Sequence, residues 1–122
     1  MSVLVCVTGQ KSCERLIVAG SRIASENKET LAVLHVVRSG DSVLGYTNEP
    51  EALEYLLRVS AEHGADMYYR RSDNVIDAIA AEAKSRGARV IVAGRARDYK
   101  GWDLLDELKT RLPGVTFEIF GA

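Results

Sequence analysis

The chain has 122 residues, 47% of them hydrophobic and 27% charged, with a formal net charge of −1 at pH 7. This balance is typical of one globular domain that can bury a sizeable core, and it excludes a disordered chain. The absence of a basic excess argues against a DNA-binding protein, and no apolar run reaches the roughly 18 residues of a membrane span. We expect a single domain over residues 1–122. The first residues are strand-like and resemble no signal peptide, so we expect a cytoplasmic location.

The first half of the chain alternates apolar runs with amphipathic ones. Residues 3–7 are apolar on both faces, as in a central parallel strand. Ser12 is the predicted N-cap of a first helix, whose inward stripe recurs at helical spacing: Cys13, Leu16, Ile17, Gly20, Ile23 and Ala24. Residues 31–37 form a second buried strand. A helix is predicted to start around Asn48 to Glu51 and to be followed by a more exposed edge strand over residues 65–71.

The second half continues the alternation. Ser72 or Asp73 is predicted to cap a third helix, and Gly87 to end it. Residues 89–93 read as a fourth strand, followed by a fourth helix that carries several leucines and stops before Pro113. Residues 115–120 predict a last strand with one apolar face. The order βαβαβαβαβ predicts an α/β fold, a three-layer sandwich with a parallel sheet and helices on both faces.

The cysteines and histidines offer little chemistry. Cys6 lies inside an apolar strand and Cys13 in the first helix, so buried, reduced thiols are expected, not a zinc site. His35 and His63 have no neighbours of ligand type, and we expect no metal. The motifs of P-loop and dinucleotide-binding proteins are absent, as are the acidic residues of a receiver domain and a catalytic triad.

What remains is the carboxyl edge of the predicted sheet, where ligands of such folds bind. Thr8, Gly9 and Lys11 follow the first strand. Gly94 ends the fourth strand and is followed by Arg95 and Arg97, with Lys100 and Gly101 further on. If the two strands are neighbours, these cations converge beside the amino end of the first helix, in an arrangement of phosphate size. The residue types leave a second interpretation open, in which the glycines only form turns and the charges are a solvated rim.

The order of elements resembles the universal stress protein family. The resemblance covers nearly the whole chain and rests on residues 3–5, on the strand Leu34-His35-Val36-Val37, and on the run from Asp77 to Gly94. It implies a Rossmann-like sheet of five strands in the order 3-2-1-4-5, homodimers, and in one branch ATP bound between the first and fourth strands. Residues His35 to Val37, at the end of the second strand, would then flank the base, with Val36 and Val37 as the predicted site residues.

The sequence departs from the ATP-binding pattern G-x2-G-x9-G-[ST]. Gly94 matches the first glycine, but Arg97 stands in place of the second, Gly101 is displaced, and the final Gly-Ser/Thr is missing. Thr8 stands where the family usually has an acidic residue. Gly94-Arg95-Ala96-Arg97 is instead similar to the variant domain of potassium-responsive sensor histidine kinases, although the kinase machinery itself has no counterpart in these residues.

Together these features predict a regulatory domain that binds ATP, another adenine nucleotide or a related phosphorylated ligand without efficient turnover. It would not be an enzyme, since the sequence suggests no general base for slow hydrolysis. The alternative is an interaction module that dimerises through Val115, Phe117 and Ile119, although the same alternation also suits ordinary core packing.

Overall fold

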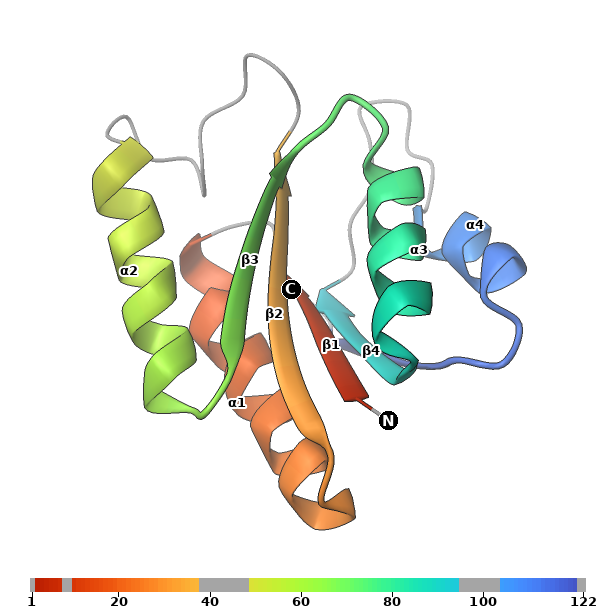
Figure 1. Ribbon diagram of the computed structural model, residues 1–122, viewed down its shortest axis with the longest axis horizontal. Helices are drawn as coiled ribbons and strands as arrows, with labels where there is room; N and C mark the ends of the chain where they lie inside the picture. Colours follow the sequence, from red (N-terminus) through yellow and green to blue (C-terminus); the bar gives the residue numbers. More distant parts are fainter. Residues whose placement is uncertain (1, 8–9, 38–48, 95–103, 121–122) are drawn as a thin grey trace.

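Nine elements alternate along the chain in the computed structural model, which describes residues 2–7, 10–37, 49–94 and 104–120. They are β1 (Ser2–Val7), α1 (Gln10–Asn27), β2 (Thr30–Val37), α2 (Glu49–Glu62), β3 (Asp66–Arg71), α3 (Val75–Arg86), β4 (Ala88–Gly94), α4 (Leu104–Arg111) and β5 (Thr116–Phe120). The strands form one sheet in the order β3-β2-β1-β4-β5, and every neighbouring pair is parallel. The predicted fold class is therefore confirmed, and β3 lies at an edge as expected (Figure 1).

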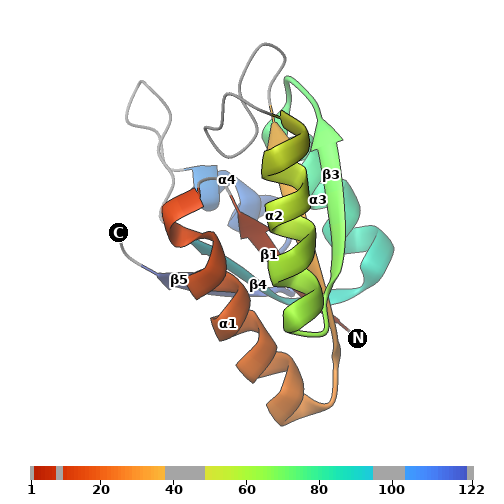
Figure 2. The ribbon, with the colours of Figure 1, turned by 90° about the vertical axis from the view of Figure 1, so that its left-hand side faces the viewer.

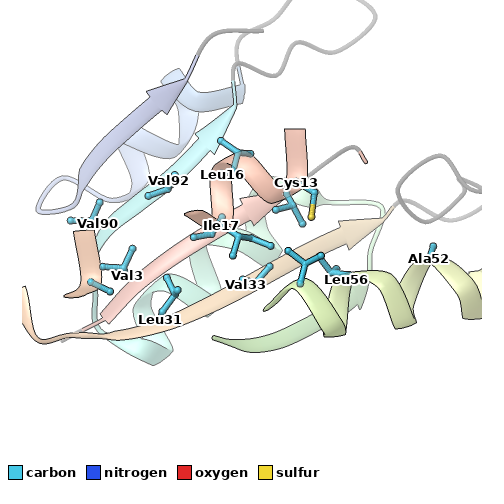
Figure 3. Close-up of a cluster of buried hydrophobic side chains, with 14 of the residues drawn as sticks. Val3, Cys13, Leu16, Ile17, Leu31, Val33, Ala52, Leu56, Val90 and Val92 are labelled. Carbon is cyan, nitrogen blue, oxygen red and sulfur yellow. The ribbon is translucent and has the colours of Figure 1, made fainter. Parts of the chain in front are cut away.

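Helices cover both faces of the sheet (Figures 1 and 2). On one face, α1 and α2 pack against the valines of the central strands, and Figure 3 shows Leu16 and Ile17 of α1 and Leu56 of α2 in this cluster. On the other face, α3 and α4 pack in a second apolar cluster. Successive residues of a strand point to opposite faces, so β1 contributes to both clusters and is buried along its whole length. The apolar run at residues 3–7 reflects this double burial.

Gly20 allows α1 to approach the sheet closely. A Cβ atom at this position would lie 2.3 Å from Cγ2 of Val5 and 3.2 Å from Cδ1 of Leu31. Both of these side chains belong to the core beneath α1. Glycine lowers the helix propensity at this position, but it permits the short distance between helix and strand.

Two predicted helix starts are wrong, and the Gly87 stop is confirmed. The first helix begins at Gln10, not after Ser12, because Gln10 and Lys11 continue the helix well. The third helix is capped by Asn74, whose Oδ1 accepts a hydrogen bond from the Asp77 amide at 3.0 Å, and not by Ser72 or Asp73. Ser72 Oγ accepts from the Asn74 amide at 3.1 Å and so forms a turn before the helix. Gly87 ends α3 with φ 61°, in the left-handed region.

Charged side chains tie the elements together at the amino ends of the strands and on the α3 side of the sheet. At the amino ends of the strands, Arg89 donates to both carboxylate oxygens of Glu29, with Nε at 3.0 and 2.9 Å, and this lowers the pKa of Glu29. On the α3 side, Glu82 accepts from Arg70 Nε at 2.7 Å and from Arg86 Nε at 3.0 Å. These arginines are engaged with carboxylates and serve the fold.

Candidate functional site

The order of the strands reverses between β1 and β4, and the candidate site lies at the carboxyl edge of this pair. The pairing of β1 with β2 extends to Val7 and His35, whereas the pairing of β1 with β4 extends to Cys6 and Ala93. In open α/β sheets, the crevice outside such a switch point is where ligands bind. Since α1 begins at Gln10, three residues after β1 ends, its amino end with its free amide groups lies at this same edge.

The structure places the backbone of four predicted site residues at this edge. Gly94 is the last residue of β4, and Val36 and Val37 end β2 on the other side of β1. Lys11 lies in the first turn of α1, and its side chain is outside the described part. Thr8, Gly9, Arg95, Arg97, Lys100 and Gly101 also lie outside the described residues. Their convergence on one corner, and the phosphate-binding role given to them, therefore stay predictions.

The described neighbours of Gly94 leave room for a larger residue at this position. A Cβ atom there would lie 3.8 Å from Cδ1 of Leu16 and 3.9 Å from the carbonyl oxygen of Phe120, which are ordinary van der Waals distances. Its φ angle is outside the left-handed region as well, in contrast to Gly64 and Gly87. Packing of the described residues thus gives no reason for a glycine at this position. A ligand that needs close approach to the backbone would give one.

Val36 and Val37 differ in how accessible their side chains are to a ligand. Val36 is half-buried and belongs to the α3 and α4 side of the sheet, whereas Val37 is buried under α1 and α2. The Val37 carbonyl already accepts a hydrogen bond from the Ser72 amide at 2.8 Å. Val36 is therefore the more accessible of the two side chains.

His35 is a polar residue of this edge that the sequence interpretation did not connect to its partner. Its side chain is 2% exposed, and its Nδ1 lies 2.7 Å from the carbonyl oxygen of Val7. Burial lowers the pKa of His35, and the hydrogen bond to Val7 only partly opposes this. We therefore expect a neutral ring at pH 7. The signal in the sequence was a single titratable residue within a fully apolar strand, which requires a buried partner.

The thiols and the metal-binding residue types provide no second site in the described part. Cys6 and Cys13 are buried free thiols, as predicted, and burial raises their pKa to about 12 and about 11. Such thiols are protonated and unreactive at neutral pH. Among the described residues, no three His, Cys, Asp or Glu side chains form a group that could hold a metal ion.

Two polar grooves lie at the opposite, amino edge of the sheet. They measure about 380 and 290 Å³ and share Thr30, Leu31 and Asp66. None of the predicted site residues lines them. Within the part of the chain that the structure describes, no helix combines the length and apolar character needed to cross a bilayer.

Comparison with known proteins gives relatives both in sequence and in structure. No protein-family model matches the chain. Over 105 residues, which make up 86% of this chain, it is 34% identical to the Sensor protein KdpD of Mycobacterium tuberculosis, in strains CDC 1551 / Oshkosh and ATCC 25618 / H37Rv. The match spans only 12% of the length of that sensor protein.

Several solved universal stress proteins share the fold over almost their full length. A universal stress protein in complex with cAMP matches with a TM-score of 0.66 and 18% identity, covering 100% of this chain and 96% of that one. The universal stress protein of Archaeoglobus fulgidus in complex with dAMP matches with a TM-score of 0.61 and 15% identity, covering 99% and 96%. The chain therefore has the fold of the universal stress proteins. In sequence it is similar to a segment of the sensor protein KdpD, and both parts of the predicted resemblance are confirmed.

Proposed function

We propose that this chain is a regulatory domain that binds an adenine nucleotide at the carboxyl edge without turning it over. The observation that carries the proposal is the position of Gly94, which ends β4 beside the point where the strand order reverses, at the same edge as the amino end of α1. Fixed backbone amides at such an edge suit phosphate. The cAMP and dAMP complexes of proteins with this fold support the class of ligand.

The proposed roles follow the two sides of the switch point. The backbone at Gly94 and the side chains of Arg95 and Arg97 would bind phosphate, with Gly101 nearby. Thr8, Gly9 and Lys11 would form the opposite wall, and Val36 and Val37 would flank the base. ATP is one candidate within this class, and a nucleoside monophosphate is another. In this proposal no side chain abstracts a proton, since the described histidine of this edge is buried and bonded to Val7.

Thermal unfolding in the presence of ATP, ADP, AMP, cAMP and cyclic dinucleotides tests the proposal. Binding to the native state at a hundredfold excess over Kd stabilises it by about 2.7 kcal/mol and raises the melting temperature. We expect an increase with at least one adenine nucleotide. No increase with any of them at millimolar concentration would refute the proposed function.

Substitutions locate the ligand. Replacing both Arg95 and Arg97 by Ala should abolish the increase, whereas the control Arg22→Ala with Lys109→Ala removes two exposed positive charges elsewhere and should leave it intact. Gly94→Ala should weaken binding without destabilising the apo protein, because its Cβ meets only ordinary contacts. Gly114→Ala, whose Cβ would have no neighbour within 4 Å, is the matched control. Unchanged binding in both the arginine double variant and Gly94→Ala would place the ligand elsewhere.

A second candidate function is self-association, and it is favoured by the edge position of β5. β5 pairs with β4 on one side only, and Val115, Phe117 and Ile119 are half-buried against the α3 and α4 cluster. They thus contribute to core packing and still leave apolar surface at an edge that could pair with a second copy. We propose a homodimer through this edge, which could operate with or without a nucleotide.

Sedimentation equilibrium decides this second proposal. A mass of two chains is expected, and Thr116→Lys, at an exposed position of β5, should shift it towards one chain. Thr110→Lys makes the same change at an exposed position of α4 and should have no effect. A single-chain mass for the unmodified protein at all concentrations would refute it. The cytoplasmic location stays a prediction, as does any role within a longer sensor protein.

A further inference from the structure

A buried imidazole stands among apolar neighbours on β2. By strand alternation His35 points to the same face as Val33 and Val37, beneath α1 and α2. Its ring lies 6.4 Å from that of Tyr69 on β3, with the two planes inclined by 38°. A polar ring that is 2% exposed needs buried hydrogen-bond partners to be retained in such a place.

The hydrogen bond between His35 and Val7 has only one possible direction. A carbonyl oxygen can only accept, so at 2.7 Å Nδ1 must carry the proton and donate it to Val7. The neutral ring is therefore the Nδ1–H tautomer. Residues 7 and 35 are also the last aligned pair of the ladder between β1 and β2. The side chain thus adds a further bond between the two strands at the point where their backbone pairing ends.

Among the aligned pairs that the structure describes, Val7 has a partner on β2 and none on β4. The β1–β4 ladder extends to Cys6 and Ala93, one residue short of Val7. Only three peptide bonds separate Val7 from Gln10, the first residue of α1, so their Cα atoms lie within roughly 11 Å. The position of the Val7 carbonyl therefore limits where the first turn of α1 can lie relative to Gly94.

We propose that His35 is a positioning residue for the nucleotide site. By donating from Nδ1 to the Val7 carbonyl, it fixes the end of β1 at the edge where Gly94 and the start of α1 lie. It acts through Val7 and not by touching the ligand, since its ring is buried. The effect on affinity rests on the proposed function, whereas the effect on the strand end does not.

Two substitutions separate the hydrogen bond from the volume of the side chain. His35→Asn keeps a nitrogen donor at about the place of Nδ1, whereas His35→Leu keeps an apolar filling of the site and removes the donor. We expect His35→Leu to weaken AMP binding, measured by calorimetry, at least tenfold, and His35→Asn to restore it to within about threefold of the unmodified protein. Leu31→Ala, at the buried amino end of the same strand, is the control for general destabilisation and should leave the affinity of the folded protein unchanged.

A measurement without ligand tests the strand end independently. In the NMR spectrum of the unmodified protein, Nδ1 of His35 should be the protonated ring nitrogen. The carbonyl carbon signal of Val7 should shift in His35→Leu and move back towards its original position in His35→Asn. An unchanged Val7 signal in His35→Leu would overturn the positioning of the strand end.

The AMP affinities of the variants test whether the position of the end of β1 affects ligand binding. A Val7 shift together with unaltered AMP affinity would overturn the link between strand end and ligand, and so would equal weakening in His35→Leu and Leu31→Ala. If the unmodified protein binds no nucleotide, the proposed function fails and the affinity claim fails with it. The Val7 signal then still decides whether His35 holds β1.

Discussion

The close contact at Gly20 makes a sharp prediction about the packing of α1. In Gly20→Ala, the new Cβ would start 2.3 Å from Cγ2 of Val5, far inside van der Waals contact, and 3.2 Å from Cδ1 of Leu31. Val5 is 0% exposed and β-branched, so its methyl group has little freedom to turn away. Either α1 moves outward or the side chains of the core leave their preferred rotamers.

The change in the free energy of unfolding on Gly20→Ala is the sum of two opposing contributions. Alanine in the middle of a helix is favoured over glycine by up to about 1 kcal/mol. Overpacking of a well-filled core typically costs about 1–3 kcal/mol. Because 2.3 Å is a severe contact between buried atoms, we expect the second term to win and Gly20→Ala to destabilise the protein by about 1–2 kcal/mol.

Urea unfolding at equilibrium measures this change, with Gly114→Ala as the control that meets no atom within 4 Å. A double-mutant cycle with Val5→Ala adds a second readout. Val5→Ala removes both methyl groups, including the contacting Cγ2, so Gly20→Ala should be less costly in this background and the two changes should couple by about 0.5–3 kcal/mol. A neutral or stabilising Gly20→Ala, or strictly additive effects, would show that α1 does not rest on β1 as described.

Three further predictions concern buried polar groups. Burial lowers the pKa of His35, so below about pH 6.5 the unfolded chain takes up a proton that the native state does not. The free energy of unfolding should therefore fall by up to about 1.4 kcal/mol per pH unit below that value. Urea unfolding across this range should show a weaker pH dependence of this free energy for His35→Asn. The Oγ of Ser60 is buried without a hydrogen-bond partner among the described residues, so Ser60→Ala should be neutral or stabilising by up to about 1 kcal/mol in thermal unfolding. Burial alone would raise the pKa of Glu82, but hydrogen bonds from Arg70 and Arg86 lower it, so its contribution is present above about pH 4.5 and is lost as the pH falls below that value. Glu82→Gln should cost about 1 kcal/mol at pH 7 and reduce this acid sensitivity, and an equal loss at pH 7 and pH 3 would contradict the assignment.

The architecture could be predicted from the sequence because its signals are local and repeated. Apolar runs without alternation mark strands buried on both faces, and the helical stripes between them require crossovers that make the sheet parallel. Strand order is different, since it depends on which strands pair. It came from the resemblance to universal stress proteins, and the structure confirms it.

Local competition and distant partners explain what the sequence did not predict. Ser72, Asp73 and Asn74 are all good capping residues, and the cap falls on Asn74 because Ser72 forms the preceding turn. The partner of His35 is a backbone carbonyl 28 residues away, and any residue type could supply it. For the site, Gly94, Val36 and Val37 are placed at the predicted edge. The roles of the neighbouring arginines remain predictions, since they lie outside the described residues.

The separation of the core into two clusters by the sheet has a practical consequence for redesign. The α1 and α2 cluster carries His35 and the end of β2, whereas Ile79, Ala83 and Leu108 lie in the cluster beneath α3 and α4. Substitutions in separate clusters without shared partners should add in their effects on stability. The α3 and α4 side can therefore be optimised for expression or heat tolerance by repacking it alone. A variant of this domain with higher thermal stability could be made in this way and then used as the background for the binding-site variants.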